Sequence, residues 1–142
     1  MGSRRSRGEV DTIYAQARAL AERVGIAVDL LPSADQEGRE DGLWIEPVSE
    51  GRFERLYMER GERIPLGRGD AADTLFAALL SASQTEAGRR EVRQRIKGQD
   101  SRRQWFRIQH DLMAAMKPEW GARTSAHHAE ILVRAPFRDD EL

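Results

Sequence analysis

Hydrophobic positions in the first third of the chain change from a helical to an extended pattern. Apolar side chains recur every three or four residues between about residues 8 and 24, and Gly25 follows at the place of a C-terminal helix cap. Short apolar runs separated by turn residues come next and predict an antiparallel meander. The predicted strands cover residues 43–48, 52–59 and 62–65.

Helical spacing returns in the second half of the chain. Asp70 is a predicted N-cap, and the apolar stripe that follows it is typical of a buried helix. The predicted helices cover residues 70–80, 85–97, 100–116 and about 120–133. The pattern therefore indicates an α+β fold, in which a short antiparallel sheet is packed by four to five helices. We expect a disordered arm over residues 1–7 and a single domain over residues 8–142.

Composition narrows the class of protein. The chain has 142 residues and no cysteine, which excludes disulfides, thiol nucleophiles and thiolate metal sites. No apolar run is long enough for a signal peptide or a membrane span, so we expect a cytoplasmic protein with no membrane partner. The net charge is −1, but residues 1–83 carry −4 and residues 84–134 carry +5.

Two polar residues fall within the apolar arc of the predicted helix 100–116. They are Arg102 and Gln109. A buried guanidinium without a partner costs several kcal/mol, so we expect Arg102 to have a carboxylate or carbonyl partner, with Glu59 as the expected carboxylate. An anion-binding or ligand-binding site is the alternative. The favoured interpretation is structural, with Glu59, Arg102 and Gln109 as candidate residues of the core.

An acidic segment over residues 29–50 is the candidate partner-binding surface. It contains one arginine and seven carboxylates, with an aromatic residue in the middle, a combination that suits an interface to a basic partner. The candidate binding residues are Glu37, Glu40, Asp41, Trp44 and Glu46. The other interpretation is a solubilising loop beside a strand in which Trp44 belongs to the core.

Eight arginines and lysines between residues 89 and 107 suggest a second class of function. Such a patch is compatible with a nucleic-acid-binding or regulatory module. The alternative is the solvated face of two surface helices. Because no nucleic-acid-binding motif accompanies the arginines, we favour that interpretation and expect no nucleic-acid partner.

The sequence contains no recognisable catalytic constellation. His110-Asp111 and His127-His128 are too few and too close together for a metal phosphohydrolase site, and we expect these histidines at the surface or at helix caps. No serine elbow, catalytic dyad or phosphate-binding loop is evident. We therefore predict a protein that is not an enzyme, with no catalytic residues, metal or cofactor.

Several motifs along the chain, in their order and spacing, resemble a known family. They are Tyr57-Met58-Glu59-Arg60-Gly61, Asp73-Thr74-Leu75-Phe76, Asp100-Ser101-Arg102-Arg103-Gln104-Trp105-Phe106, Pro118-Glu119-Trp120 and Ala135-Pro136-Phe137-Arg138-Asp139. Together they resemble the immunity protein 63 family of bacterial polymorphic toxin systems. The resemblance implies a small α+β protein that binds and neutralises a toxin domain from the same cell without catalysis. It also implies that the pattern residues hold the fold rather than contact the toxin; these are Glu59, Arg60, Gly61, Arg102, Arg103, Gln109, Trp120, Pro136 and Phe137.

Overall fold

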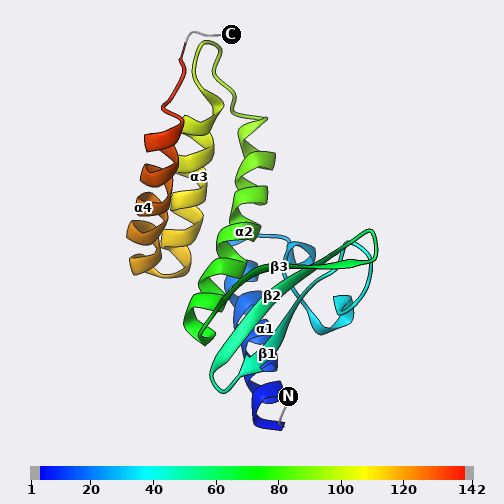
Figure 1. Cartoon of the computed structure of the whole chain (residues 1–142). Coiled ribbons are helices and arrows are strands. Elements are labelled where there is room, and N and C mark those ends of the chain that lie inside the picture. Colours follow the sequence, from blue (N-terminus) through cyan, green and yellow to red (C-terminus); the bar gives the residue numbers. More distant parts are fainter. Residues whose placement is uncertain (1–3, 140–142) are drawn as a thin grey trace. The chain divides into compact units, whose positions relative to one another are not determined.

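The computed structural model describes residues 4–139 and is α+β, as the sequence predicts (Figure 1). Within that range the elements are α1 (Arg4–Val24), β1 (Leu43–Ser49), β2 (Arg52–Glu59), β3 (Glu62–Gly69), α2 (Ala71–Glu91), α3 (Ser101–Met116) and α4 (Pro118–Arg134), with 3-10 turns at Val28–Leu30 and Ala34–Gln36. The strands form the predicted antiparallel meander, in the order β1-β2-β3. The chain divides into two compact units, one ending at Leu79 and the other beginning at Leu80. No described helix is long and apolar enough to cross a membrane.

Helix α1 begins earlier than its apolar pattern suggests. Its first residue is Arg4, so residues 4–7 of the expected disordered arm are helical, and residues 1–3 lie outside the described part of the chain. The predicted apolar stripe is buried through Val10, Ile13, Ala17 and Ala21. The extra turn is polar and carries no periodic signal, which is why the pattern did not include it.

Two glycines with positive φ lie in the first unit at turns that the sequence predicts: Gly25 ends α1, and Gly61 lies between β2 and β3. Gly25 has φ 81°, and the Ile26 N–H donates to the Ala21 carbonyl at 2.9 Å, as in a Schellman cap. Arg60 and Gly61 join β2 to β3 with φ values of 51° and 77°. Positive φ at both central residues is the geometry of a two-residue type I′ hairpin, whose twist matches the strands.

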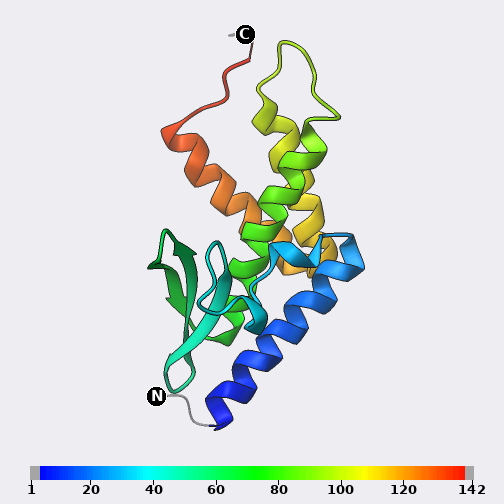
Figure 2. The same ribbon diagram turned by 90° about the vertical axis from the view of Figure 1, so that its right-hand side faces the viewer.

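The outer edge of β1 is closed by groups from outside the sheet. Helix α1 lies beside β1 (Figures 1 and 2). Tyr14 on α1 bonds to both backbone groups of Ile45: the Ile45 N–H donates to the Tyr14 oxygen at 2.8 Å, and the hydroxyl donates to the Ile45 carbonyl at 3.2 Å. At Leu43, the N–H donates to Gln36 Oε1 at 2.9 Å, and the carbonyl accepts the Ser33 N–H at 3.1 Å. Because free edge groups invite pairing with another chain, these bonds close β1 to strand addition.

Replacing Tyr14 with Phe tests this closure. We expect Tyr14→Phe to lower the free energy of unfolding by about 1–2 kcal/mol, because both backbone groups of the buried residue Ile45 lose their partner. Urea unfolding followed by circular dichroism measures the change. Tyr57→Phe is the matched control, since its hydroxyl bonds to Asp41 in an exposed position. Equal losses in the two variants would contradict the role of Tyr14.

Helix α2 is one continuous element. Asp70 caps it as predicted, with its Oδ1 accepting the Asp73 N–H at 2.8 Å. The helix predicted over residues 85–97, whose continuity with its neighbours the sequence left open, is confirmed only in its first seven residues, which continue α2 to Glu91; the rest lie outside any helix. Val92 and Ile96, the only apolar anchors of the predicted helix, are 64% and 48% exposed. No buried stripe therefore extends the helix beyond Glu91.

Close helix contacts in the second unit depend on glycine. The Trp105 indole N–H donates to the Gln84 carbonyl at 2.8 Å, and a Cβ on Gly88 would lie 3.0 Å from the Trp105 ring. Helices α3 and α4 pack against each other in the same way, since a Cβ on Gly121 would lie 2.9 Å from the Ala114 Cβ (Figure 2). A larger residue at either glycine would force the facing group to move.

Candidate functional site

Glu40, a candidate binding residue of the acidic segment, is held by the backbone of the first unit. Its two carboxylate oxygens accept the N–H groups of Arg60 and Gly61 at 2.6 and 3.0 Å. These are the two residues of the β2–β3 turn. Glu40 therefore fixes a hairpin whose strained φ values need support, and its carboxylate is already engaged inside the protein.

Three further candidates also have internal partners. Asp41 accepts a hydrogen bond from the Tyr57 hydroxyl at 2.9 Å, which raises the pKa of Tyr57. Glu46 accepts the indole N–H of Trp44 at 2.6 Å and pairs with Arg63. Trp44 itself is only 1% exposed. The expectation that its ring anchors a partner is therefore corrected: the ring is part of the core.

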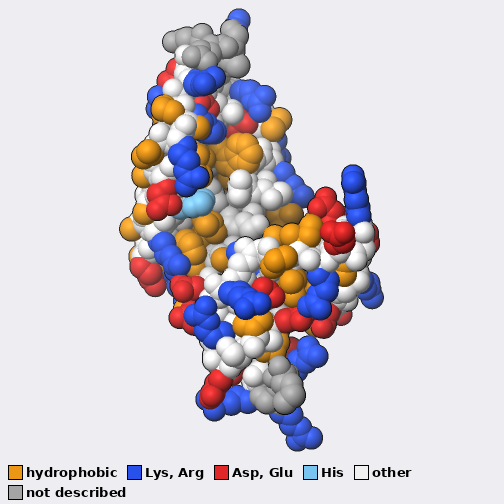
Figure 3. Space-filling view, viewed as in Figure 1, with side chains coloured by type: hydrophobic (Ala, Val, Ile, Leu, Met, Phe, Trp, Pro, Cys, Tyr) orange, Lys and Arg blue, Asp and Glu red, His pale blue; other side chains and the backbone are white. Residues whose placement is uncertain are grey.

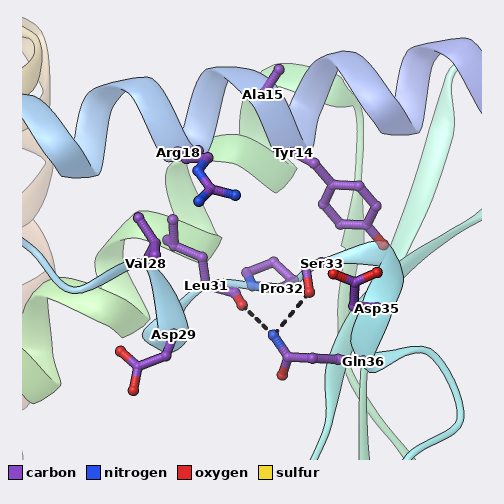
Figure 4. Close-up of a pocket in the computed structure, with 10 residues that line it drawn as sticks. All are labelled: Tyr14, Ala15, Arg18, Val28, Asp29, Leu31, Pro32, Ser33, Asp35 and Gln36. Atoms are coloured by element: carbon purple, nitrogen blue, oxygen red, sulfur yellow. Dashed lines mark hydrogen bonds between the residues drawn. The ribbon is translucent and has the colours of Figure 1, made fainter.

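Three of the carboxylates that stay available lie at the start of the acidic segment; the fourth, Glu50, lies at its end, 3.9 Å from Arg5. Glu37 is 44% exposed and lies 3.7 Å from Arg7, a loose pair, whereas Asp29 and Asp35 have no hydrogen bond or ion pair to any described residue. Both aspartates border a pocket of about 410 Å³ (Figure 4). Its other lining residues are Tyr14, Ala15, Arg18, Val28, Leu31, Pro32, Ser33 and Gln36. Over the sheet itself, acidic and basic side chains are interspersed (Figure 3).

The basic segment over residues 89–107 is largely neutralised within the second unit. The ion pairs are Arg90–Glu86, Arg95–Glu91, Arg102–Asp100, Arg103–Asp139 and Arg107–Asp111. Among the described residues only Arg89, Arg93 and Lys97 of this segment lack a carboxylate partner. Three unpaired charges are a small electrostatic footprint for binding nucleic acid, since affinity scales with the number of phosphates neutralised.

Arg102 is the centre of a clamp that holds the C-terminal segment. Its Nη2 lies 2.8 Å from Asp100 Oδ2, and its guanidinium donates to the carbonyls of Ala135 and Pro136 at 2.7 Å each. The expected ion pair therefore exists, but its partner is Asp100 rather than Glu59. The pairing holds the pKa of the Asp100 carboxyl well below its usual value. Asp100 also caps α3 by accepting the Arg102 N–H.

A second set of contacts completes the clamp. Asp139 lies 2.7 Å from Arg103 Nη2 and accepts the Asp100 N–H at 2.8 Å, and these bonds lower the pKa of its carboxyl. The Arg103 guanidinium stands 4.1 Å from the centre of the Phe137 ring, within the range of a cation–π interaction. Two sequence motifs, 100–106 and 135–139, are thus the two halves of one structural feature.

Gln109 is the buried polar residue of α3. It is 3% exposed, and its Nε2 donates to the Leu80 carbonyl at 2.9 Å and to Ser83 Oγ at 3.2 Å. Its Oε1 lies 2.7 Å from His128 Nε2. Gln109 therefore joins α2, α3 and α4 within the second unit, and it gives hydrogen-bond partners to polar groups that are otherwise buried without one.

His128 is a central residue that the sequence analysis placed at the surface or at a cap. It is only 6% exposed, and its ring stacks on Phe106 with centroids 4.0 Å apart. Burial lowers the pKa of His128 from 6.5 to about 4, so the imidazole is neutral at pH 7. The available signal was spacing: Trp120, Thr124 and His128 are four residues apart on α4, and all three are buried.

A shallow pocket of about 350 Å³ opens beside His128 in the second unit. Its walls are mostly apolar. The lining residues are Phe106, Arg107, His110, Ser125, His128, Ala129, Leu132 and Phe137. The clamp described above holds Phe137, so the C-terminal segment forms part of this pocket's wall.

The ionisable side chains with the most strongly shifted pKa values take part in structural contacts. Within residues 4–139, no group of three or more His, Asp or Glu side chains is arranged to hold a metal ion. Asp100 and His128, whose pKa values are strongly lowered, are engaged by Arg102 and Gln109 in contacts that fix helices. Burial raises the pKa of Tyr14 to about 12, and its hydroxyl bonds to the backbone of Ile45. Perturbed pKa values of this kind arise from structural networks as well as from active sites.

Comparison with known proteins identifies one relationship. No curated protein and no solved structure matches the chain. The family model described as "Immunity protein 63" matches residues 50–130, which is more than half of the chain and includes β2, β3, α2, α3 and most of α4. The matched range spans four of the five motifs that carry the resemblance, and the fifth, residues 135–139, lies beyond it. The chain therefore belongs to the immunity protein 63 family.

Proposed function

We propose that this protein is a cytoplasmic immunity protein of a polymorphic toxin system, which binds a cognate toxin domain and neutralises it without catalysis. Membership of the immunity protein 63 family carries the proposal. The internal engagement of Asp100, His128 and Arg102 supports it, because these groups stabilise the fold. Neutralisation then follows from occlusion of the toxin's active site by an interface of about 800 Å² per partner.

The surface that we propose for the toxin lies at the start of the acidic segment. Asp29, Asp35 and Glu37 are the carboxylates there with no partner or a loose one. Residues 1–83 carry a net charge of −4, which favours a basic partner and accelerates its encounter. The exposed apolar edge of Val28, beside the pocket that Asp29 and Asp35 border, adds contact area.

Capture from the source organism tests the function. A tagged copy of the protein, purified from a lysate, is expected to retain one toxin domain at a one-to-one ratio by light scattering. Co-expression is expected to protect cells from that domain. Recovery of nucleic acid, or of no protein at all, would overturn the proposed function.

Charge reversal tests the surface. We expect the triple variant Asp29→Lys, Asp35→Lys and Glu37→Lys to weaken toxin binding at least about tenfold with little change in melting temperature, because each residue makes no close internal contact. Glu40 and Asp41 are unsuitable, since their reversal would break the hairpin contacts. The matched control reverses three exposed carboxylates that also lack partners: Glu59→Lys, Glu62→Lys and Glu130→Lys. Equal weakening in both triples would show that only net charge matters.

A further inference from the structure

The pocket beside His128 has the features of a specific binding site. We propose that it receives the phenol ring of a tyrosine side chain on the toxin domain, with the phenol hydroxyl donating to His128 Nδ1. This inference rests on the proposed function for the source of the tyrosine. The site itself is defined by contacts within the second unit.

The first step fixes the orientation of the Gln109 amide. The Leu80 carbonyl can only accept a hydrogen bond, so the Gln109 atom that lies 2.9 Å from it is the NH2 group. The Gln109 oxygen therefore faces His128 Nε2 at 2.7 Å and must accept from it. Nε2 carries the proton, and in a neutral imidazole the other nitrogen, Nδ1, is then an acceptor with a free lone pair.

The second step locates that lone pair. Among the described residues, Gln109 is the one hydrogen-bond partner of the His128 side chain. Among the described residues, the buried side-chain polar atoms without a partner are the hydroxyls of Thr74 and Thr124, so the unpaired Nδ1 must keep contact with solvent. His128 is 94% buried, with 6% of its surface exposed, and it lines the pocket. Its free acceptor therefore opens into the pocket.

The third step selects the ligand. The walls formed by Phe106, Leu132 and Phe137 favour an apolar body and disfavour a carboxylate, which would lose its hydration there. Arg107 at the same pocket repels a lysine or arginine side chain. Ser125 and His110 are further polar lining residues, but both are more exposed than His128. The buried acceptor His128 Nδ1 beside mostly apolar walls calls for a neutral ring that carries one donor, and a phenol combines both. Tyrosine is also among the residues most enriched at the centres of protein interfaces.

A small phenol tests the site on the isolated protein. In a nitrogen-15 NMR titration with p-cresol, we expect a saturable shift of the His128 Nδ1 resonance, as for an imidazole nitrogen that accepts a hydrogen bond. Toluene, which has the same ring but no hydroxyl, should bind about tenfold more weakly. His128→Gln can place its amide NH2 where Nε2 stands, as a donor for Gln109, but it has no acceptor at the position of Nδ1, so it should bind p-cresol no better than toluene.

Blocking the pocket provides the matched pair of variants. Ala129 and Ala126 are both exposed on α4, but only Ala129 lines the pocket. Ala129→Trp should abolish p-cresol binding, and Ala126→Trp should leave it unchanged. The absence of a saturable shift with p-cresol, or equal binding of toluene, would overturn the site.

The toxin complex separates this inference from the proposed function. If wild-type protein captures a toxin domain, Ala129→Trp is expected to weaken capture at least about tenfold, whereas Ala126→Trp is not. Unchanged capture by Ala129→Trp would overturn the tyrosine contact and leave the immunity function standing. Capture of no toxin by any form would overturn the function, and with it the toxin tyrosine, while the p-cresol titration would still decide the phenol site.

Discussion

Replacing Gln109 with Met is expected to lower the free energy of unfolding by about 3 kcal/mol. Met has nearly the volume of Gln, so the loss comes from hydrogen bonding rather than from a cavity. The His128 Nε2–H would be left buried without an acceptor, which costs about 1–3 kcal/mol. The bonds to the Leu80 carbonyl and to Ser83 would also be lost. Each of these groups lies in the second unit, where α2, α3 and α4 meet.

Urea unfolding of wild type and variant measures this loss, provided that the slope of the transition is unchanged. Gln104→Met is the control on the same helix. Gln104 bonds to Gln99 and to Arg107, both in partly or fully exposed positions, so we expect a loss of at most about 0.5 kcal/mol. A comparable loss in the two variants would show that the buried network adds nothing beyond ordinary surface hydrogen bonds.

The parts of the fold that were predicted correctly are those with local causes. The hairpin turn at Arg60-Gly61 and the caps at Asp70 and Gly25 depend on residues that are close in sequence. The strands and the helix starting near Asp100 follow from apolar spacing alone. The continuity of the helices near residue 85 could not be predicted, because large apolar residues are few there although the helix continues to Glu91.

Local sequence patterns could not predict contacts between residues that are far apart in the sequence. The sequence indicated that Arg102 needs a carboxylate or carbonyl partner, and Glu59 was a reasonable choice. The actual partner, Asp100, is two residues away, and carbonyls 33 and 34 residues further along the chain complete its coordination. Nothing local marks a backbone carbonyl as a ligand for a guanidinium. The motif resemblance did identify Arg102 and Pro136 together, but not that they touch.

The candidate toxin surface was predicted only as a region. Acidic composition pointed to residues 29–50, yet composition does not tell which carboxylates are already bonded. The structure assigns Glu40 to a hairpin turn and Glu46 to Trp44 and Arg63, and it leaves Asp29 and Asp35 unengaged. Availability of a charged group is therefore a property of the fold, and it decides which residues are worth mutating.

Acidification is expected to destabilise the protein through His128. Its pKa falls from 6.5 to about 4 on folding, so the folded state favours the neutral ring. The resulting stabilisation is fully present above pH 6.5, and it is lost progressively as the pH falls from 6.5 toward 4, because the unfolded chain binds the proton first. Between pH 7 and pH 5 we expect a loss of about 2 kcal/mol.

Urea unfolding at a series of pH values measures this loss, and His128→Gln isolates it. Gln at this position keeps a donor for Gln109 but does not titrate, so the decline between pH 7 and pH 5 should be about 2 kcal/mol smaller than in wild type. Titration of the Asp100 carboxyl does not contribute to the loss of stability between pH 7 and pH 5. Arg102 lowers its pKa below 3.8, so its contribution is present above that value and is lost only at lower pH. If the unfolding free energies of wild type and His128→Gln changed with pH in parallel, the prediction would be contradicted. The His128 ring would then take up a proton in the folded state as easily as in the unfolded chain, and it would have to be more exposed in solution.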